Sequence, residues 1–132
     1  MADFYLSEDN CVRRLYAEYT KHKSLIVGFD FDDTVFDFHR AGHTFDEVIE
    51  QLRRAKMLGC YLIIITGNPN TELIRTYCAE QNIPYDAINE HAPFLIDTAR
   101  KIYCNIMLDD RAGLPSSYAI LKRVLDAAEE HG

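Results

Sequence analysis

The chain has 132 residues, of which 48 % are hydrophobic and 27 % charged, and its formal net charge is −7. This size fits a single domain over residues 1–132, and the acidic charge disfavours broad nucleic-acid binding, which needs a basic face. Because no apolar run approaches the roughly 18 residues that span a bilayer and the acidic start is unlike a signal peptide, we expect a cytoplasmic protein with no membrane contact.

The first part of the chain predicts two helices with a strand between them. Residues 8–22 carry apolar side chains at helical spacing, and residues 25–29 form a short apolar run of the kind found in buried strands. A second helix is predicted over residues 44–58, where Thr44 and Glu47 have the spacing of a capping box and a glycine follows the last apolar residue.

The rest of the chain continues the alternation. Residues 60–65 are apolar throughout, which predicts a central strand covered on both faces. A helix over 70–81, short strands over 85–88 and 102–108, and a last helix over 116–130 follow. This order predicts a three-layer α/β/α sandwich around a mostly parallel, Rossmann-like sheet, with helices on both faces.

The cysteines offer no recognisable metal or disulfide framework. None belongs to a CxxC pair or has Cys/His ligand spacing, and most lie in apolar patterns. We interpret them as small hydrophobic residues rather than as metal ligands or disulfide partners. They are Cys11, Cys60, Cys78 and Cys104.

Polar side chains follow three of the predicted strands, and a parallel sheet brings such positions to one edge. They are Asp30, Asp32 and Asp33, then Thr66, Gly67 and Asn68, and finally Asp109, Asp110 and Arg111. The aspartates would repel one another unless a cation lay between them, and oxygen ligands suit Mg²⁺. The sequence therefore predicts a magnesium site at this edge.

The residue types also point to phosphate chemistry. Asp30 and Asp32 alternate along the chain, so one carboxylate faces the cation while the other turns away and takes a different role. The Thr66 hydroxyl and the amides of Gly67 and Asn68 precede a helix, a setting that binds phosphate well. A lysine ahead of the last strand, Lys101, adds a positive charge.

Three segments resemble motifs of the haloacid dehalogenase-like phosphohydrolases. FDFDDTV at 29–35 resembles the first motif, DxDxT[LV]; LIIITG at 62–67 resembles the second; and IMLDD at 106–110 resembles the fourth. Many members have glycine where this chain has Asp33. The segments between motifs are too short for the cap domain of many members, so the resemblance implies a capless member with an open site, which a second copy of the chain covers or a large substrate fills.

The resemblance also implies roles for individual residues. Asp30 would be the nucleophile that forms an aspartyl-phosphate, and Asp32 would be the general acid and base. Mg²⁺ would be held by the Asp30 side chain, the Asp32 main-chain carbonyl and Asp110, with Asp109 supporting these ligands or pairing with the lysine. Thr66 would bind a phosphoryl oxygen.

The remaining basic residues are less determined by the resemblance. Lys101 would stabilise the charge on the nucleophile and the phosphoryl group, with Arg100 and Arg75 as alternatives. His39 and His43 lie where the family's flap overhangs the site, and both a substrate contact and a plain exposed position stay open. Arg111 adjoins the site without an assigned role.

The function expected on this basis is Mg²⁺-dependent hydrolysis of a phosphomonoester, which could be a nucleotide, a sugar phosphate or a phosphorylated polynucleotide end. One alternative is a non-catalytic module that binds phosphate and metal. Another is a phospho-receiver signalling domain, although its phosphoacceptor aspartate would have to end a mid-chain strand, where this sequence has Thr66.

Overall fold

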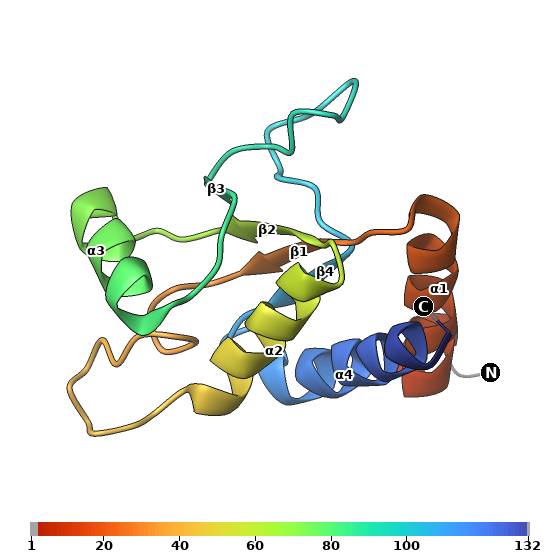
Figure 1. The fold of residues 1–132 in the computed structure, drawn as a ribbon, viewed down its shortest axis with the longest axis horizontal. Helices are drawn as coiled ribbons and strands as arrows, with labels where there is room; N and C mark the ends of the chain where they lie inside the picture. Colours follow the sequence, from red (N-terminus) through yellow and green to blue (C-terminus); the bar gives the residue numbers. More distant parts are fainter. Residues whose placement is uncertain (1–2, 132) are drawn as a thin grey trace.

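Four parallel strands form the centre of the computed structural model, which describes residues 3–131 (Figure 1). Their order across the sheet is β3-β2-β1-β4, and every pairing is parallel. The strands are β1 (Ile26–Phe29), β2 (Tyr61–Ile64), β3 (Ala87–Ile88) and β4 (Ile106–Leu108). The chain has the predicted α/β, Rossmann-like three-layer architecture, in which helices form one outer layer and the irregular segment 89–105, rather than a second layer of helices, forms the other.

The helices are close to their predicted positions. They are a short 3-10 helix η1 (Phe4–Leu6) and four α-helices, α1 (Glu8–His22), α2 (Asp46–Met57), α3 (Thr71–Gln81) and α4 (Leu114–His131). Helix α4 begins earlier than predicted because Pro115 is tolerated in a first turn, where the main-chain N–H has no partner within the helix. Within residues 3–131, none of these helices is long and apolar enough to cross a membrane.

The predicted capping box of α2 is wrong. The helix begins after Phe45, whose side chain makes no capping hydrogen bond, so Thr44 lies outside the helix. Glu47 is then the second helical residue rather than the third, and it cannot complete the box. The acidic first turn of α2 still complements the positive end of the helix dipole.

All four α-helices contribute to the core on one face of the sheet. Val27 and Phe29 of β1 point into this core together with Leu62 and Ile64 of β2, and all four side chains are buried. Figure 1 shows α1, α2 and α4 lying along this side of the sheet. Burying so much apolar surface against one face is the main stabilising contribution of the fold.

Residues 89–105 form the layer on the opposite face. Ala92, Leu95, Ile102 and Cys104 from this segment pack against Ile26 and Ile63. In Figure 1 the segment rises away from the sheet after β3 and returns to β4 without a helix. The predicted strand over 102–108 is therefore reduced to its last three residues, because the apolar side chains before Asn105 cover the sheet instead of extending it.

Two of the four cysteines have the full burial expected of small hydrophobic residues. All four are free thiols; Cys60 and Cys78 are buried, whereas Cys11 and Cys104 are half-buried. Burial raises the pKa of the Cys78 thiol to about 11, so this side chain is neutral at physiological pH.

Candidate functional site

An acidic cluster lies where the strand order reverses, between β1 and β4. From β1 the chain proceeds to β2 and β3 on one side, and β4 lies on the other side. In such sheets the crevice beyond the carboxyl ends of the two strands at this point is the usual ligand site. Asp30 directly follows β1, and Asp109 and Asp110 directly follow β4.

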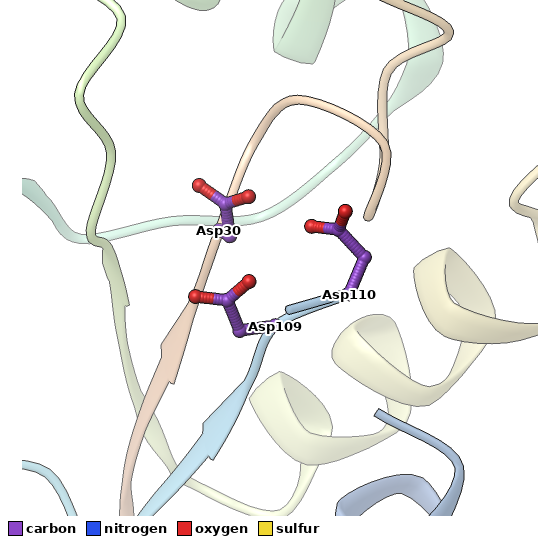
Figure 2. Close-up of side chains that lie close together, drawn as sticks. All are labelled: Asp30, Asp109 and Asp110. Atoms are coloured by element: carbon purple, nitrogen blue, oxygen red, sulfur yellow. The ribbon is translucent and has the colours of Figure 1, made fainter. Parts of the chain in front are cut away.

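The carboxylate of Asp30 converges with those of Asp109 and Asp110, although Asp30 precedes Asp109 by 79 residues in sequence. One side-chain oxygen from each of Asp30, Asp109 and Asp110 lies within 4.8 Å of the other two. Figure 2 shows all three side chains turned toward a common space beyond the strand ends. Asp30 and Asp109 are half-buried, and Asp110 is exposed.

Burial and the neighbouring carboxylates raise the pKa of Asp30. Partial burial, the negative charge of Asp109 and the hydrogen bond to Asp110 together raise the pKa of Asp30 from 3.8 to about 7, while the hydrogen bond from the Phe31 N–H acts to lower it. A divalent cation would reverse this effect by favouring the ionised carboxylate. Three converging carboxylate oxygens, partly open to water, fit a hard cation such as Mg²⁺.

Thr34 holds Asp110 through two hydrogen bonds. Its side chain is fully buried, and its hydroxyl donates to Oδ1 of Asp110 at 3.3 Å while accepting from the Asp110 main-chain N–H at 3.1 Å. The chain reaches Thr34 through a tight turn, in which the Phe31 carbonyl accepts from the Val35 N–H at 3.1 Å. The two hydrogen bonds between Thr34 and Asp110 thus tie the loop after β1 to the loop after β4.

Asp33 has a backbone conformation that favours glycine. Its φ is 60°, in the left-handed region that asparagine, aspartate and glycine tolerate best. Its carboxylate lies 2.7 Å from Nδ1 of His39, so this histidine is tied to the loop that carries the first motif, whereas His43 is exposed. The sequence left the position of His39 open, and the structure assigns it this contact.

Asp32 lies outside the three-carboxylate cluster. Its Oδ1 accepts a hydrogen bond from Nδ2 of Asn68 at 3.2 Å. The main-chain N–H of Asn68 donates to the Thr66 hydroxyl oxygen at 3.0 Å, and Gly67 between them is exposed. The structure thus brings the loop after β2 to the loop after β1.

Sequence reasoning missed Asn89, which follows β3. Its side-chain amide accepts from the Thr66 N–H at 2.9 Å and donates to the Thr66 carbonyl at 2.8 Å. The rule that identified the other clusters, namely the polar residues after each strand, would also have found this one. Asn89 occupies that position after the third predicted strand.

The structure does not place Lys101 with the carboxylates. Lys101 is exposed and lines an open groove of about 1290 Å³ together with Arg14 and His22 of α1. Burial raises the pKa of Cys104 and the positive charge of Lys101 partly opposes that rise, whereas the charges acting on Asp30 come from Asp109 and Asp110. Lys101 precedes β4 by a few irregular residues rather than lying at a strand end, so its distance from the site could not be read from sequence.

Arg111 meets the cluster only through its main chain in the described contacts. Its N–H donates to Oδ1 of Asp109 at 2.9 Å, which orients that carboxylate, and its side chain is exposed. Arg75 and Arg100, the alternatives to Lys101, are also exposed.

Comparison with known proteins supports the fold alone. No family model matches the chain, and no curated protein matches it. A solved structure of a conserved protein from Bacteroides thetaiotaomicron is similar, with a TM-score of 0.60 and 21% sequence identity over 76% of this chain and 91% of that chain. Similarity at this level of identity shows a shared architecture.

The strand order also bears on the receiver alternative. In receiver domains the order is 2-1-3-4-5, so β1 lies between β2 and β3. Here β1 lies between β2 and β4, and β3 is an edge strand beside β2. The receiver reading is therefore contradicted by the topology.

Proposed function

We propose that the protein is a Mg²⁺-dependent phosphomonoesterase of the haloacid dehalogenase-like group. The observation that carries this proposal is the convergence of Asp30, Asp109 and Asp110 at the point where the strand order reverses. Asp32, two residues from Asp30, is held outside that cluster by a neutral amide. Asp30 therefore lies beside other carboxylates, whereas Asp32 does not. This difference in surroundings suits Asp30 as a nucleophile and Asp32 as a proton carrier.

The proposed reaction has two steps. In the first, an Asp30 carboxylate oxygen attacks phosphorus, the bond to the leaving oxygen breaks, and Asp32 gives its proton to that oxygen. In the second, Asp32 takes a proton from water as the water oxygen attacks the aspartyl-phosphate. Inorganic phosphate leaves, and Asp30 is a carboxylate again.

The three clustered aspartates would hold the cation, whose positive charge would offset the charge on the phosphoryl oxygens. Asp30 also has to be ionised to act as a nucleophile, and the cation favours that form. The Thr66 hydroxyl, already accepting from Asn68, retains its proton for donation to a phosphoryl oxygen. Lys101 is left out of this proposal because of its position along the groove.

The net charge of the chain narrows the substrate class, and no separate domain covers the site. The connection from β1 to α2 and the segment 89–105 are the longest links between elements, and neither forms a separate domain. The net charge of −7 makes a polynucleotide end less suitable than a nucleotide or a sugar phosphate. The Asp33–His39 pair lies on the first of these connections, where a contact with the leaving group would be made.

Hydrolysis of p-nitrophenyl phosphate tests the proposal. We expect turnover that requires Mg²⁺ and falls by at least about a thousandfold in Asp30→Asn, since a covalent step is removed. Asp97→Asn is a matched control, because Asp97 is exposed on the segment 89–105. Turnover that is unchanged in Asp30→Asn would refute the proposal, and Mg²⁺ binding without turnover would favour a non-catalytic binding module.

A further inference from the structure

We propose that Asn68 is a positioning residue for Asp32, and that Asn89 serves the same purpose indirectly by fixing Thr66. This inference rests on the function proposed above, in which Asp32 carries the proton of the leaving group. It assigns a purpose to amide side chains that neither touch the acidic cluster nor belong to the motifs.

Both polar atoms of the Asn68 side-chain amide, Nδ2 and Oδ1, are hydrogen-bonded. Nδ2 donates to Oδ1 of Asp32 at 3.2 Å, and Oδ1 accepts from the main-chain N–H of Asn70 at 2.9 Å. Because Oδ1 has a donor as its partner, the nitrogen has to be the atom that faces Asp32. The amide therefore has one orientation, and that orientation presents a donor to the carboxylate.

The main chain around Asn68 is also fixed. Its N–H donates to the Thr66 hydroxyl oxygen, and both main-chain polar groups of Thr66 bond to the Asn89 side chain. The Asn89 N–H in turn donates to the Ile64 carbonyl of β2 at 2.8 Å. The contacts thus run without interruption from the end of β2 to Asp32.

Asn89 is suited to this position by its backbone as well. Its φ is 53°, a left-handed conformation that asparagine adopts more readily than most residues. In this conformation the side-chain amide reaches back and pairs with Thr66 as a neighbouring strand would. β3 has only two residues, and beyond its end the Asn89 side chain makes the hydrogen bonds to β2's extension at Thr66 that a longer strand would make through its main chain.

A neutral amide suits a carboxyl group that both gives and takes a proton, because it can hydrogen-bond to the group without strongly favouring the ionised form. A lysine or arginine in its place would orient Asp32 but would strongly favour the ionised form. An amide orients the carboxyl group without adding charge. Placement matters because proton transfer requires hydrogen-bond distance to the leaving oxygen, and an error of about 1 Å can cost about a hundredfold in rate.

The kinetic test compares two leaving groups in the Mg²⁺-loaded protein. Phenolate needs protonation as it leaves, whereas p-nitrophenolate is stable enough to need little. We expect Asn68→Ala to lower kcat/KM for phenyl phosphate about tenfold more than for p-nitrophenyl phosphate. Asn89→Ala should act in the same direction, and equal losses for both substrates would overturn the positioning role.

Asn70→Ala is the matched control from the same loop. The Asn70 side chain caps α3 by accepting from the Leu73 N–H at 3.1 Å, and only its main chain contacts Asn68. The variant should lower the melting temperature yet keep the ratio of the two kcat/KM values within about twofold of wild type. A changed ratio in Asn70→Ala would mean that general loosening of the loop explains the effect, which would overturn the inference.

A measurement without turnover separates this inference from the proposed function. In the metal-free protein, NMR should show exchange of an Asn68 Nδ2 proton about tenfold slower than in Asp32→Ala, since one hydrogen bond to a carboxylate is lost. Equal exchange in the two proteins would overturn the inference whatever the activity. Slow exchange in a protein that hydrolyses neither substrate would instead overturn the proposed function, and with it the catalytic purpose of the contact.

Discussion

Replacement of Asp30 by asparagine should stabilise the metal-free protein at alkaline pH. The wild-type carboxyl group has a pKa raised from 3.8 to about 7, first by burial and then by Asp109 and Asp110. An acid whose pKa is higher in the folded than in the unfolded state binds more protons when folded, so stability falls as the pH rises between the two values. Asparagine carries no charge and removes this loss.

The size of the effect follows from the shift. Moving the pKa from 3.8 to about 7 corresponds to about 4 kcal/mol, at about 1.4 kcal/mol for each factor of ten in proton affinity. Because the side chain is half-buried, solvent screening reduces this to about 2 kcal/mol. We therefore expect the free energy of unfolding of Asp30→Asn, relative to wild type, to rise by about 2 kcal/mol between about pH 4.5 and about pH 8.

Urea denaturation in the presence of a chelator, followed by circular dichroism across this pH range, measures the difference. Asp97→Asn is the control, since Asp97 is exposed and its φ of 56° is one that asparagine tolerates. Parallel stability curves for wild type and Asp30→Asn would refute the reasoning, because they would mean that neither burial nor the neighbouring carboxylates raise the pKa of Asp30 in the folded protein.

Added Mg²⁺ should raise the free energy of unfolding of the wild type more than that of Asp30→Asn. A cation held by the cluster stabilises the wild type by about 2.7 kcal/mol at a hundred times its Kd. It should stabilise Asp30→Asn much less, since one of the three ligands is no longer charged. Equal stabilisation of both proteins would place the cation elsewhere.

Three further predictions concern the scaffold of the site. Gly28→Ala should lower the free energy of unfolding by roughly 1–3 kcal/mol in urea denaturation, because the added Cβ would lie 2.7 Å from Cδ1 of Ile65. Asn105→Ala should cost roughly 1–3 kcal/mol in the same assay, since its Oδ1 accepts from the Ile26 N–H at 2.6 Å; an unchanged midpoint would show that water replaces this bond. Asn70→Ala should cost about 1 kcal/mol in thermal unfolding through the lost α3 cap, and no change would mean that another group caps the helix.

Sequence predictions succeeded where the structure depends on the local hydrophobic pattern, and failed where it depends on an exact helix start or on tertiary packing. The helix over 8–22 and the apolar strand beginning at Tyr61 were predictable because hydrophobic periodicity reports directly on the buried face of an element. The capping box at Thr44 failed because a shift of one residue in the N-cap of α2, from Thr44 to Phe45, removes its geometry. Residues 102–105 were misread because side chains that cover a sheet are as apolar as those within it.

The sequence by itself determined that acidic and polar residues follow the strands, and a parallel sheet then requires them to share one edge. The tertiary structure decided which of them meet. Asp30 lies with Asp109 and Asp110 because β4 pairs with β1, and strand order is set by packing between distant segments rather than by local pattern. The same long-range packing half-buries Asp30 and so raises its pKa, brings Asn68 to Asp32, and leaves Lys101 along a different surface.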